Sequence, residues 1–282
     1  MLLNVGCGAV AHPAWLNLDL APQHPLAVAC DLRAGLPVGS ASCDATYSSH
    51  VLEHLCAAQA VPFLDEQYRV LKPGGIMRVV VPDLEQLCRL YLQHLEALKQ
   101  GELDREFGYR FALLEIFDQV VRDRSGGELL AQYLAASPQE AAYILERHGD
   151  EARRHMPGAV GSHMETPRVV RGARPPFAQR VAGRLARYRA KAAALAARVV
   201  GGADAAKALA IGRFRLSGEV HRVMYDRWGL EQLLLQRGFQ QVQVVSATES
   251  RIAGFADFEL DAAGGQVRKP DSLFVEAMKP RS

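Results

Sequence analysis

The most constraining feature of the chain is a short apolar run near its start that ends in two glycines. Residues 2–5 read Leu-Leu-Asn-Val, and residues 6–8 read Gly-Cys-Gly. A second apolar run, Trp15 to Leu18, is closed by Asp19. Glycines let the backbone approach a ligand closely, and a carboxylate can accept hydrogen bonds from both hydroxyls of a ribose. The pattern therefore predicts a nucleoside-binding site on an α/β fold.

Short apolar runs alternate with helical patterns through the first third of the chain. Between Ala57 and Leu71, apolar residues recur at spacings of three and four, which predicts a helix with one apolar face. Lys-Pro-Gly-Gly at 72–75 is expected to end that helix and turn the chain. Strands alternating with helices predict a doubly wound parallel sheet with its ligand site at the carboxyl ends of the strands. The expected strands cover residues 2–5, 15–18, 27–29, 45–48 and 76–81.

The rest of the chain divides into a helical block and a return to the α/β pattern. A helix over 226–237, then strands over 239–245 and 272–278, predict a sheet that closes with an antiparallel last pair. We therefore expect a Rossmann-like core formed by residues 1–94 and 218–282, with residues 95–217 inserted as a helical lid. Helices of this middle part of the chain are expected at 85–100, 103–124, 127–135, 138–154 and 177–199.

The inserted block contains a strongly basic segment. Between Arg168 and Arg215 there are ten Arg and two Lys against one acid, Asp204. Residues 168–176 are rich in Arg, Gly and Pro and are expected to be a linker. Within 177–199, apolar residues alternate at spacings of four and three, so a packed lid helix with a solvated basic face is the favoured interpretation. The alternative is a cap that holds an anionic substrate or lies on a membrane surface.

Composition excludes several classes of protein. Hydrophobic residues make up 49% and charged residues 23%, as in ordinary globular proteins. The chain contains no run of 18 apolar residues, so no transmembrane helix is predicted. The start of the chain does not resemble a secretion signal. The five cysteines all lie in the first third without Cys-x-x-Cys spacing, so we expect reduced thiols, no zinc site and no metal ligands. These features predict a cytoplasmic protein, with attachment to the inner membrane face as the alternative.

Further motifs follow the glycine loop at regular distances. They are Cys-Asp-Leu at 30–32, the segment Asp44 to Leu55, the turn at 72–75 and Pro-Asp at 82–83. Together with the glycine loop and Asp19, they resemble the class I S-adenosylmethionine (SAM) dependent methyltransferases. The resemblance implies a loop under the methionine part of SAM, a ribose-binding Asp19, and Asp31 beside the adenine. The implied cofactor-binding residues are Asn4, Gly6, Cys7, Gly8, Asp19, Leu20, Asp31, Leu32, Ser48 and Ser49.

The same resemblance places the fourth strand and the turn after it near the transferred methyl group. His50 lies in that turn, and its imidazole can take a proton from a hydroxyl acceptor. A structural role for His50 is an equally supported interpretation. Glu53 and His54 are expected on the first turn of the next helix, where capping and packing are the favoured roles.

Two further residues are candidates for catalysis. Asp83 follows the fifth strand, where it would orient a sugar hydroxyl or act as a base, or else cap the helix beginning at Leu84. His221 precedes the closing helix and, with Arg222 and Tyr225, is expected to face the pocket from the lid side.

The chain departs from the family pattern between its first two strands. Only ten residues separate Gly8 from Asp19, which is too few for a full crossover helix with its loops. Pro13 lies in the middle of that stretch and disfavours a helix. We therefore expect a shortened or irregular first crossover.

The motifs favour methyl transfer to a hydroxyl or carboxyl of a small-molecule, glycan or carrier-linked acceptor. The set most resembles bacterial methyltransferases of surface-polysaccharide and other glycan pathways. An NAD-type oxidoreductase would need a longer glycine motif and a later acid. A nucleic-acid methyltransferase would use the basic block at 168–215, where aromatic residues for base stacking are sparse. A SAM-binding module without activity is the remaining alternative.

Overall fold

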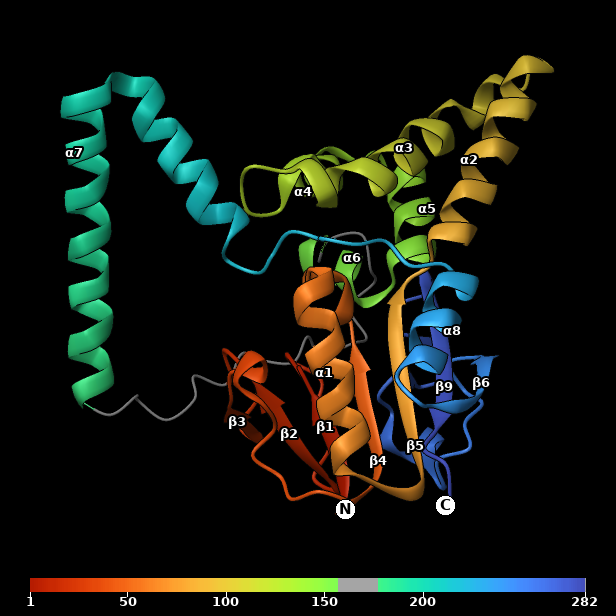
Figure 1. The fold of residues 1–282 in the computed structure, drawn as a ribbon. Helices are drawn as coiled ribbons and strands as arrows, with labels where there is room; N and C mark the ends of the chain where they lie inside the picture. Colours follow the sequence, from red (N-terminus) through yellow and green to blue (C-terminus); the bar gives the residue numbers. More distant parts are fainter. Residues whose placement is uncertain (157–176, 282) are drawn as a thin grey trace.

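A seven-stranded sheet forms the centre of the protein, as the computed structural model shows for residues 1–156 and 177–281 (Figure 1). The strand order is β3-β2-β1-β4-β5-β9-β6. Strands β1 to β5 pair in parallel, whereas β9 is antiparallel to both β5 and β6. This arrangement confirms the predicted mostly parallel α/β sheet. The strands are β1 (Leu2–Val5), β2 (Trp15–Asp19), β3 (Ala27–Ala29), β4 (Cys43–Ser49), β5 (Leu71–Pro82), β6 (Gln240–Val245) and β9 (Ser272–Met278).

The Lys-Pro-Gly-Gly turn lies inside a strand, which corrects the expectation that β5 starts at residue 76. Helix α1 (Ala57–Val70) runs directly into β5, and Leu71 already pairs with Cys43. The next pair is Ile76 with Ala45, so residues 72–75 bulge out of the ladder. The end of the helix was correctly predicted, but residues 72–75 form a bulge within β5 and not a turn before it.

Helices cover one face of the sheet. Alternate residues of β5, namely Met77, Val79 and Val81, are buried on the face that packs against α1 and α8 (Arg227–Gln236). Both helices lie in front of the sheet in Figure 1. Because side chains alternate along a strand, Ile76, Arg78 and Val80 point to the opposite face.

The opposite face is covered mainly by a segment without α-helix, residues 246–271. No helix forms at residues 6–14 between β1 and β2, which confirms the expected irregular crossover. Trp15 instead packs edge-on against Phe255 and Phe258, at ring distances of 6.4 and 5.5 Å. The covering segment contains the 3-10 helix η4 (Phe255–Phe258) and the two-stranded ribbon of β7 (Ala262–Ala263) and β8 (Gln266–Val267).

One buried arginine fastens this segment to the sheet. The guanidinium of Arg78 donates to the carboxylates of Asp261 at 2.7 Å and Glu276 at 2.9 Å. It also donates to the carbonyl oxygens of Ser246 at 2.8 Å and Glu249 at 2.9 Å. Arg78 and Glu276 are completely buried, so the charges of the network are compensated within the protein.

The helices between β5 and α8 have a hydrophobic core of their own, which includes Phe111 and Ile144. The helix expected at 138–154 is broken at Gly149, where φ is +51° and a Cβ would lie 2.4 Å from the carbonyl oxygen of Arg268. This close contact, and an ion pair of 2.6 Å between Arg268 and Asp150, join the helices to the segment 246–271. The helices are α2 (Leu84–Lys99), α3 (Glu106–Val121), α4 (Gly127–Ala135), α5 (Pro138–His148) and α6 (Asp150–His155), with the 3-10 turn η3 (Leu103–Arg105).

Helix α7 (Phe177–Arg215) is longer than the predicted 177–199 and is kinked at Gly202. The expected linker at 168–176 lies outside the described residues. The apolar residues expected to pack along 177–199 include Tyr188, Leu195 and Val199, and all three are exposed. The prediction that these residues pack against the rest of the protein was therefore wrong. No helix of the described ranges is long and apolar enough to cross a membrane.

Candidate functional site

A cavity of about 490 Å³ opens at the carboxyl ends of β1 to β4. It lies where the strand order reverses, between β1 and β4. Doubly wound sheets bind their ligands at this point, outside the carboxyl ends of the strands. Its volume is in the range of small-molecule and cofactor sites. The first strands and the glycine loop form one wall, and α6, residues 216–222 and the segment 246–271 form the other.

The two glycines of the first loop have different structural roles. Gly6 has φ of +77°, and a Cβ there would lie 2.3 Å from Cγ2 of Val51, so no other residue fits without displacement. Gly8 has φ of +52° and lines the cavity, and a Cβ there would meet nothing within 4 Å. The loop therefore presents bare backbone to the cavity at Gly8, as close approach of a ligand requires.

The carboxylate of Asp19 is fixed against the glycine loop. It accepts hydrogen bonds from the backbone N–H of Gly8 and of Ala21, each at 2.8 Å. A carboxylate has about four acceptor positions, so Asp19 keeps capacity for two ribose hydroxyls. Leu20, next to it, also lines the cavity and is 56% exposed. These residues fit the nucleoside end of SAM.

Asp31 lines the cavity, but its own turn occupies its carboxylate. It caps the 3-10 helix η1 (Leu32–Ala34), accepting from the backbone N–H of Arg33, and pairs with the Arg33 guanidinium at 2.8 Å. The hydrogen bonds from Arg33 lower the pKa of Asp31 to about 2. Leu32 lies beside it on the same wall.

The other expected cofactor residues divide into cavity-lining and supporting positions. Asn4, Cys7 and Ser49 line the cavity, and the Asn4 amide donates to Asn17 at 3.0 Å and to the carbonyl oxygen of Val10. Burial raises the pKa of the Cys7 thiol to about 11, so it remains protonated. Ser48 does not line the cavity, because successive residues of β4 alternate between faces.

His50 lies at the floor of the cavity with φ of +55°, an uncommon conformation for a residue with a side chain. Its Nε2 is 2.8 Å from the Ser272 hydroxyl, and its Nδ1 is 3.4 Å from Oε1 of Glu53. Burial lowers the pKa of His50 well below its ordinary value, so the ring is neutral. Both ring nitrogens therefore already face protein groups.

Asp83 and His221 do not reach the cavity, which corrects their expected position at its rim. Asp83 caps α2 by accepting from the backbone N–H of Gln86 at 3.0 Å. His221 is buried edge-on against His54, at a ring distance of 4.8 Å. Of the residues expected beside His221, Arg222 lines the cavity, whereas Tyr225 belongs to the core.

Glu53 and His54 lie on a separate 3-10 turn, η2 (Leu52–His54), and not on the first turn of α1. His54 lines the cavity, whereas Glu53 is completely buried behind it. Burial raises the pKa of Glu53, and burial lowers the pKa of His54 to about 4.

Sequence reasoning missed the basic residues of the second wall. Arg154 comes from α6, and Arg268 and Lys269 precede β9. Arg268 is paired with Asp150, whereas no described acid lies within 4.0 Å of Arg154 or Lys269. Burial lowers the pKa of Lys269. The local signals for this wall are two basic pairs, Arg-Arg at 153–154 and, shortly before the last strand, Arg-Lys at 268–269.

One family model matches the part of the chain that contributes the first wall of the cavity. Residues 3–79 match the family described as methyltransferase domain. No curated protein matches the chain. Among solved structures, a SAM-dependent methyltransferase of Mesorhizobium loti is 19% identical over 29% of this chain and 46% of its own, with a TM-score of 0.24. One of Archaeoglobus fulgidus is 10% identical over 99% of this chain and 85% of its own, with a TM-score of 0.36.

The chain covers 59%, 46% and 48% of the length of three of the matching solved structures, which is less than two thirds of each. The family match spans β1 to β5 and includes the glycine loop and Asp19. It implies SAM as the cofactor, and it supports a class I SAM-dependent methyltransferase.

Proposed function

We propose that this protein transfers a methyl group from SAM to a carboxyl or hydroxyl oxygen of an anionic small-molecule, glycan or carrier-linked acceptor. The observation that carries the proposal is the polarity of one cavity. Its first wall presents bare backbone and a fixed carboxylate. Its second wall presents Arg154 and Lys269, while its two carboxylates, Asp150 and Asp261, are paired with arginines.

The first wall has the groups that a nucleoside ligand needs. Asp19, held by the backbone of Gly8 and Ala21, would accept the ribose hydroxyls, and Leu20 and Leu32 would contact the adenine. When bound, SAM supplies a methyl group on a positively charged sulfur, which is strongly electrophilic. The protein then contributes chiefly by holding an acceptor oxygen in line with that methyl group.

The second wall favours an acceptor with negative charge. Arg154 and Lys269 face the same cavity without a described acid within 4.0 Å, so an anionic group would be their partner. An ionised carboxylate is already a nucleophile and needs no base. A hydroxyl needs a base, and His50 would have to give up its hydrogen bond to Ser272 to serve as one. Within the proposed class, the geometry therefore favours a carboxylate, as in a sugar acid.

The helical block supplies part of this acceptor wall. Asp150 and Arg154 come from α6, and residues 216–218 follow α7. This placement supports the proposal that residues 95–217 recognise the acceptor, whereas the core of residues 1–94 and 218–282 binds the cofactor.

Calorimetric titration with SAM tests the cofactor half, with NADH as the contrasting ligand. We expect SAM to bind, NADH not to bind, and Asp19→Ala to abolish SAM binding. Asp65→Ala removes an exposed carboxylate of α1 far from the cavity and is the matched control. Normal SAM binding by Asp19→Ala would reject the assignment of the cavity.

A transfer assay with radiolabelled SAM tests the acceptor half. Sugar acids should accept the methyl group, and the corresponding neutral sugars should not. Lys269→Met should raise KM for the acid and leave SAM affinity unchanged. Equal use of acidic and neutral acceptors would refute the anionic acceptor.

A further inference from the structure

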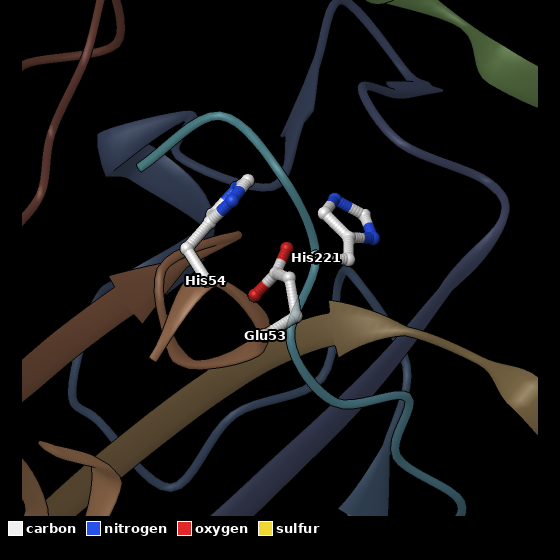
Figure 2. A group of neighbouring side chains, drawn as sticks. All are labelled: Glu53, His54 and His221. Atoms are coloured by element: carbon white, nitrogen blue, oxygen red, sulfur yellow. The ribbon is translucent and has the colours of Figure 1, made fainter. Parts of the chain in front are cut away.

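Three side chains with metal-binding atoms converge behind the cavity wall. They are Glu53 and His54 from η2 and His221 from the segment after α7 (Figure 2). Their ligand atoms all lie within 4.8 Å of one another. Figure 2 shows the three side chains gathered together, with the two imidazole rings 4.8 Å apart and the carboxylate of Glu53 beside them.

Four polar atoms of this cluster have no hydrogen-bond partner among the described residues. Glu53 is 0% exposed and His221 is 3% exposed. No described protein group donates a hydrogen bond to either oxygen of Glu53, and Nδ1 of each histidine also has no hydrogen-bond partner. The single ion-pair contact of the carboxylate among the described residues is the His50 ring, at 3.4 Å. Buried polar groups are almost always satisfied, so three such groups together indicate a ligand.

The backbone holds the three residues in register. The carbonyl oxygen of Glu53 accepts from the N–H of Arg222 at 2.7 Å, which fixes η2 against the segment that bears His221. The N–H of His221 donates to the carbonyl oxygen of Gln119 at 3.0 Å, at the end of α3. The cluster is therefore assembled by the packing of the helical block on the sheet.

We propose that Glu53, His54 and His221 bind a divalent transition-metal ion, for which Zn²⁺ is the best match. Two imidazole nitrogens and one carboxylate oxygen are a common ligand set of zinc sites that keep an open position. At bond lengths of about 2.1 Å, two ligands of one tetrahedral ion are about 3.4 Å apart, so the ligand atoms would move closer by up to about 1.4 Å on binding. Hard ions such as Mg²⁺ prefer all-oxygen sites and should bind poorly.

This site does not depend on the proposed methyl transfer. His54 lines the cavity, so the ion would lie in the cavity wall beside His50. The spacing of the cysteines predicted no zinc site and no metal ligands. The proposed site departs from that prediction, because its ligands are two histidines and a carboxylate.

The test is a Zn²⁺ titration of metal-free, reduced protein, followed by calorimetry. Cys56 and Cys88 are exposed, so both are first replaced by serine to remove competing thiols. We expect one ion per chain, no comparable binding of Mg²⁺, and affinity lowered about 100-fold or more by His54→Gln or His221→Gln. His94→Gln is the matched control, because His94 is also buried but hydrogen-bonds to Tyr143 within the helical block.

A second measurement decides the matter if these variants fail to fold. Co²⁺ bound by nitrogen and oxygen ligands gives visible absorption that the aqueous ion lacks, and it needs no substitution in the cluster. Absence of that absorption at saturating Co²⁺, or variants that bind Zn²⁺ as tightly as the parent, would overturn the proposal. SAM titration of the same samples is independent, so failure of either proposal is visible without the other.

Discussion

Replacement of Arg78 by Met should destabilise the protein because it leaves two buried carboxylates without their cation. Methionine keeps much of the aliphatic volume and removes the guanidinium. Among the described residues, the Asp261 carboxylate would then keep only the hydrogen bond from the Tyr47 hydroxyl, at 2.5 Å. Glu276 would keep its contacts with Ser250 and Arg251.

The expected loss follows from the bonds removed. Each of the two charge-assisted hydrogen bonds from Arg78 contributes on the order of 1.5–3 kcal/mol. Removing one partner of a buried ion pair usually costs about 3–5 kcal/mol. Because Glu276 keeps other donors, we expect the free energy of unfolding to fall by about 3 kcal/mol. Adding Asp261→Asn should recover about 1 kcal/mol or more, since it removes the uncompensated charge.

Urea unfolding followed by tryptophan fluorescence measures this loss. Trp15 contacts the covering segment and is buried, whereas Trp228 is 70% exposed, so a Trp228→Phe background isolates the informative signal. Arg89→Met removes an exposed pair of α2 with Glu85 and should change stability by less than about 0.5 kcal/mol. A loss below 1 kcal/mol for Arg78→Met would refute this account of the network.

The loss in the free energy of unfolding caused by Arg78→Met should also depend on pH. In the parent, burial raises the pKa of Glu276, but the hydrogen bonds from Ser250, Arg251 and Arg78 outweigh it and lower that pKa overall. A carboxylate with a lowered folded-state pKa stabilises the protein above its unfolded pKa, and this contribution is lost as pH falls. In Arg78→Met part of that contribution is already missing. The difference between variant and parent should therefore be largest near neutral pH and shrink in acid.

Three further predictions concern the cavity. Gly6→Ala should weaken SAM binding and lower the free energy of unfolding by about 2–4 kcal/mol, because it adds a clash with Val51 to a strained φ. A melting temperature equal to that of the parent would contradict this. His50→Gln should lower turnover with little change in SAM affinity, measured by transfer assay and calorimetry, and unchanged turnover would return His50 to a structural role. Gly149→Ala should lower the melting temperature through its contact with the Arg268 backbone, whereas Gly264→Ala, at a similar φ in open space, should do so less.

The sheet could be predicted from the sequence because its strands carry local signals. The run Ser272 to Met278 was predicted to the residue, since it is apolar and bounded by polar residues. The start of β5 was missed because pairing of Leu71 with Cys43 precedes a bulge that no periodicity reveals. The break at Gly149 was missed for a similar reason, because its cause is a backbone contact with a residue more than a hundred positions away.

The site was predictable only where it lies on the first strands. Asp19 and Gly8 lie close together in sequence, and the motifs that follow them at regular distances predicted a shared function. Arg154 and Lys269 belong to segments without a motif, and only the tertiary fold brings them to the cavity. The partner of His54 and Glu53 is His221, which no sequence pattern connects with them.

Residues 246–271, which cover one face of the first strands, are synthesised long after those strands. Strand β5 is complete at Pro82, but the segment that covers its second face follows roughly 160 residues later. At the usual pace of translation, this apolar face stays bare for on the order of ten to thirty seconds. Trp15 and Phe255 are therefore among the last contacts available to a nascent chain. Such high contact order slows folding, and yield in cells should depend on chaperones that shield the unfinished sheet.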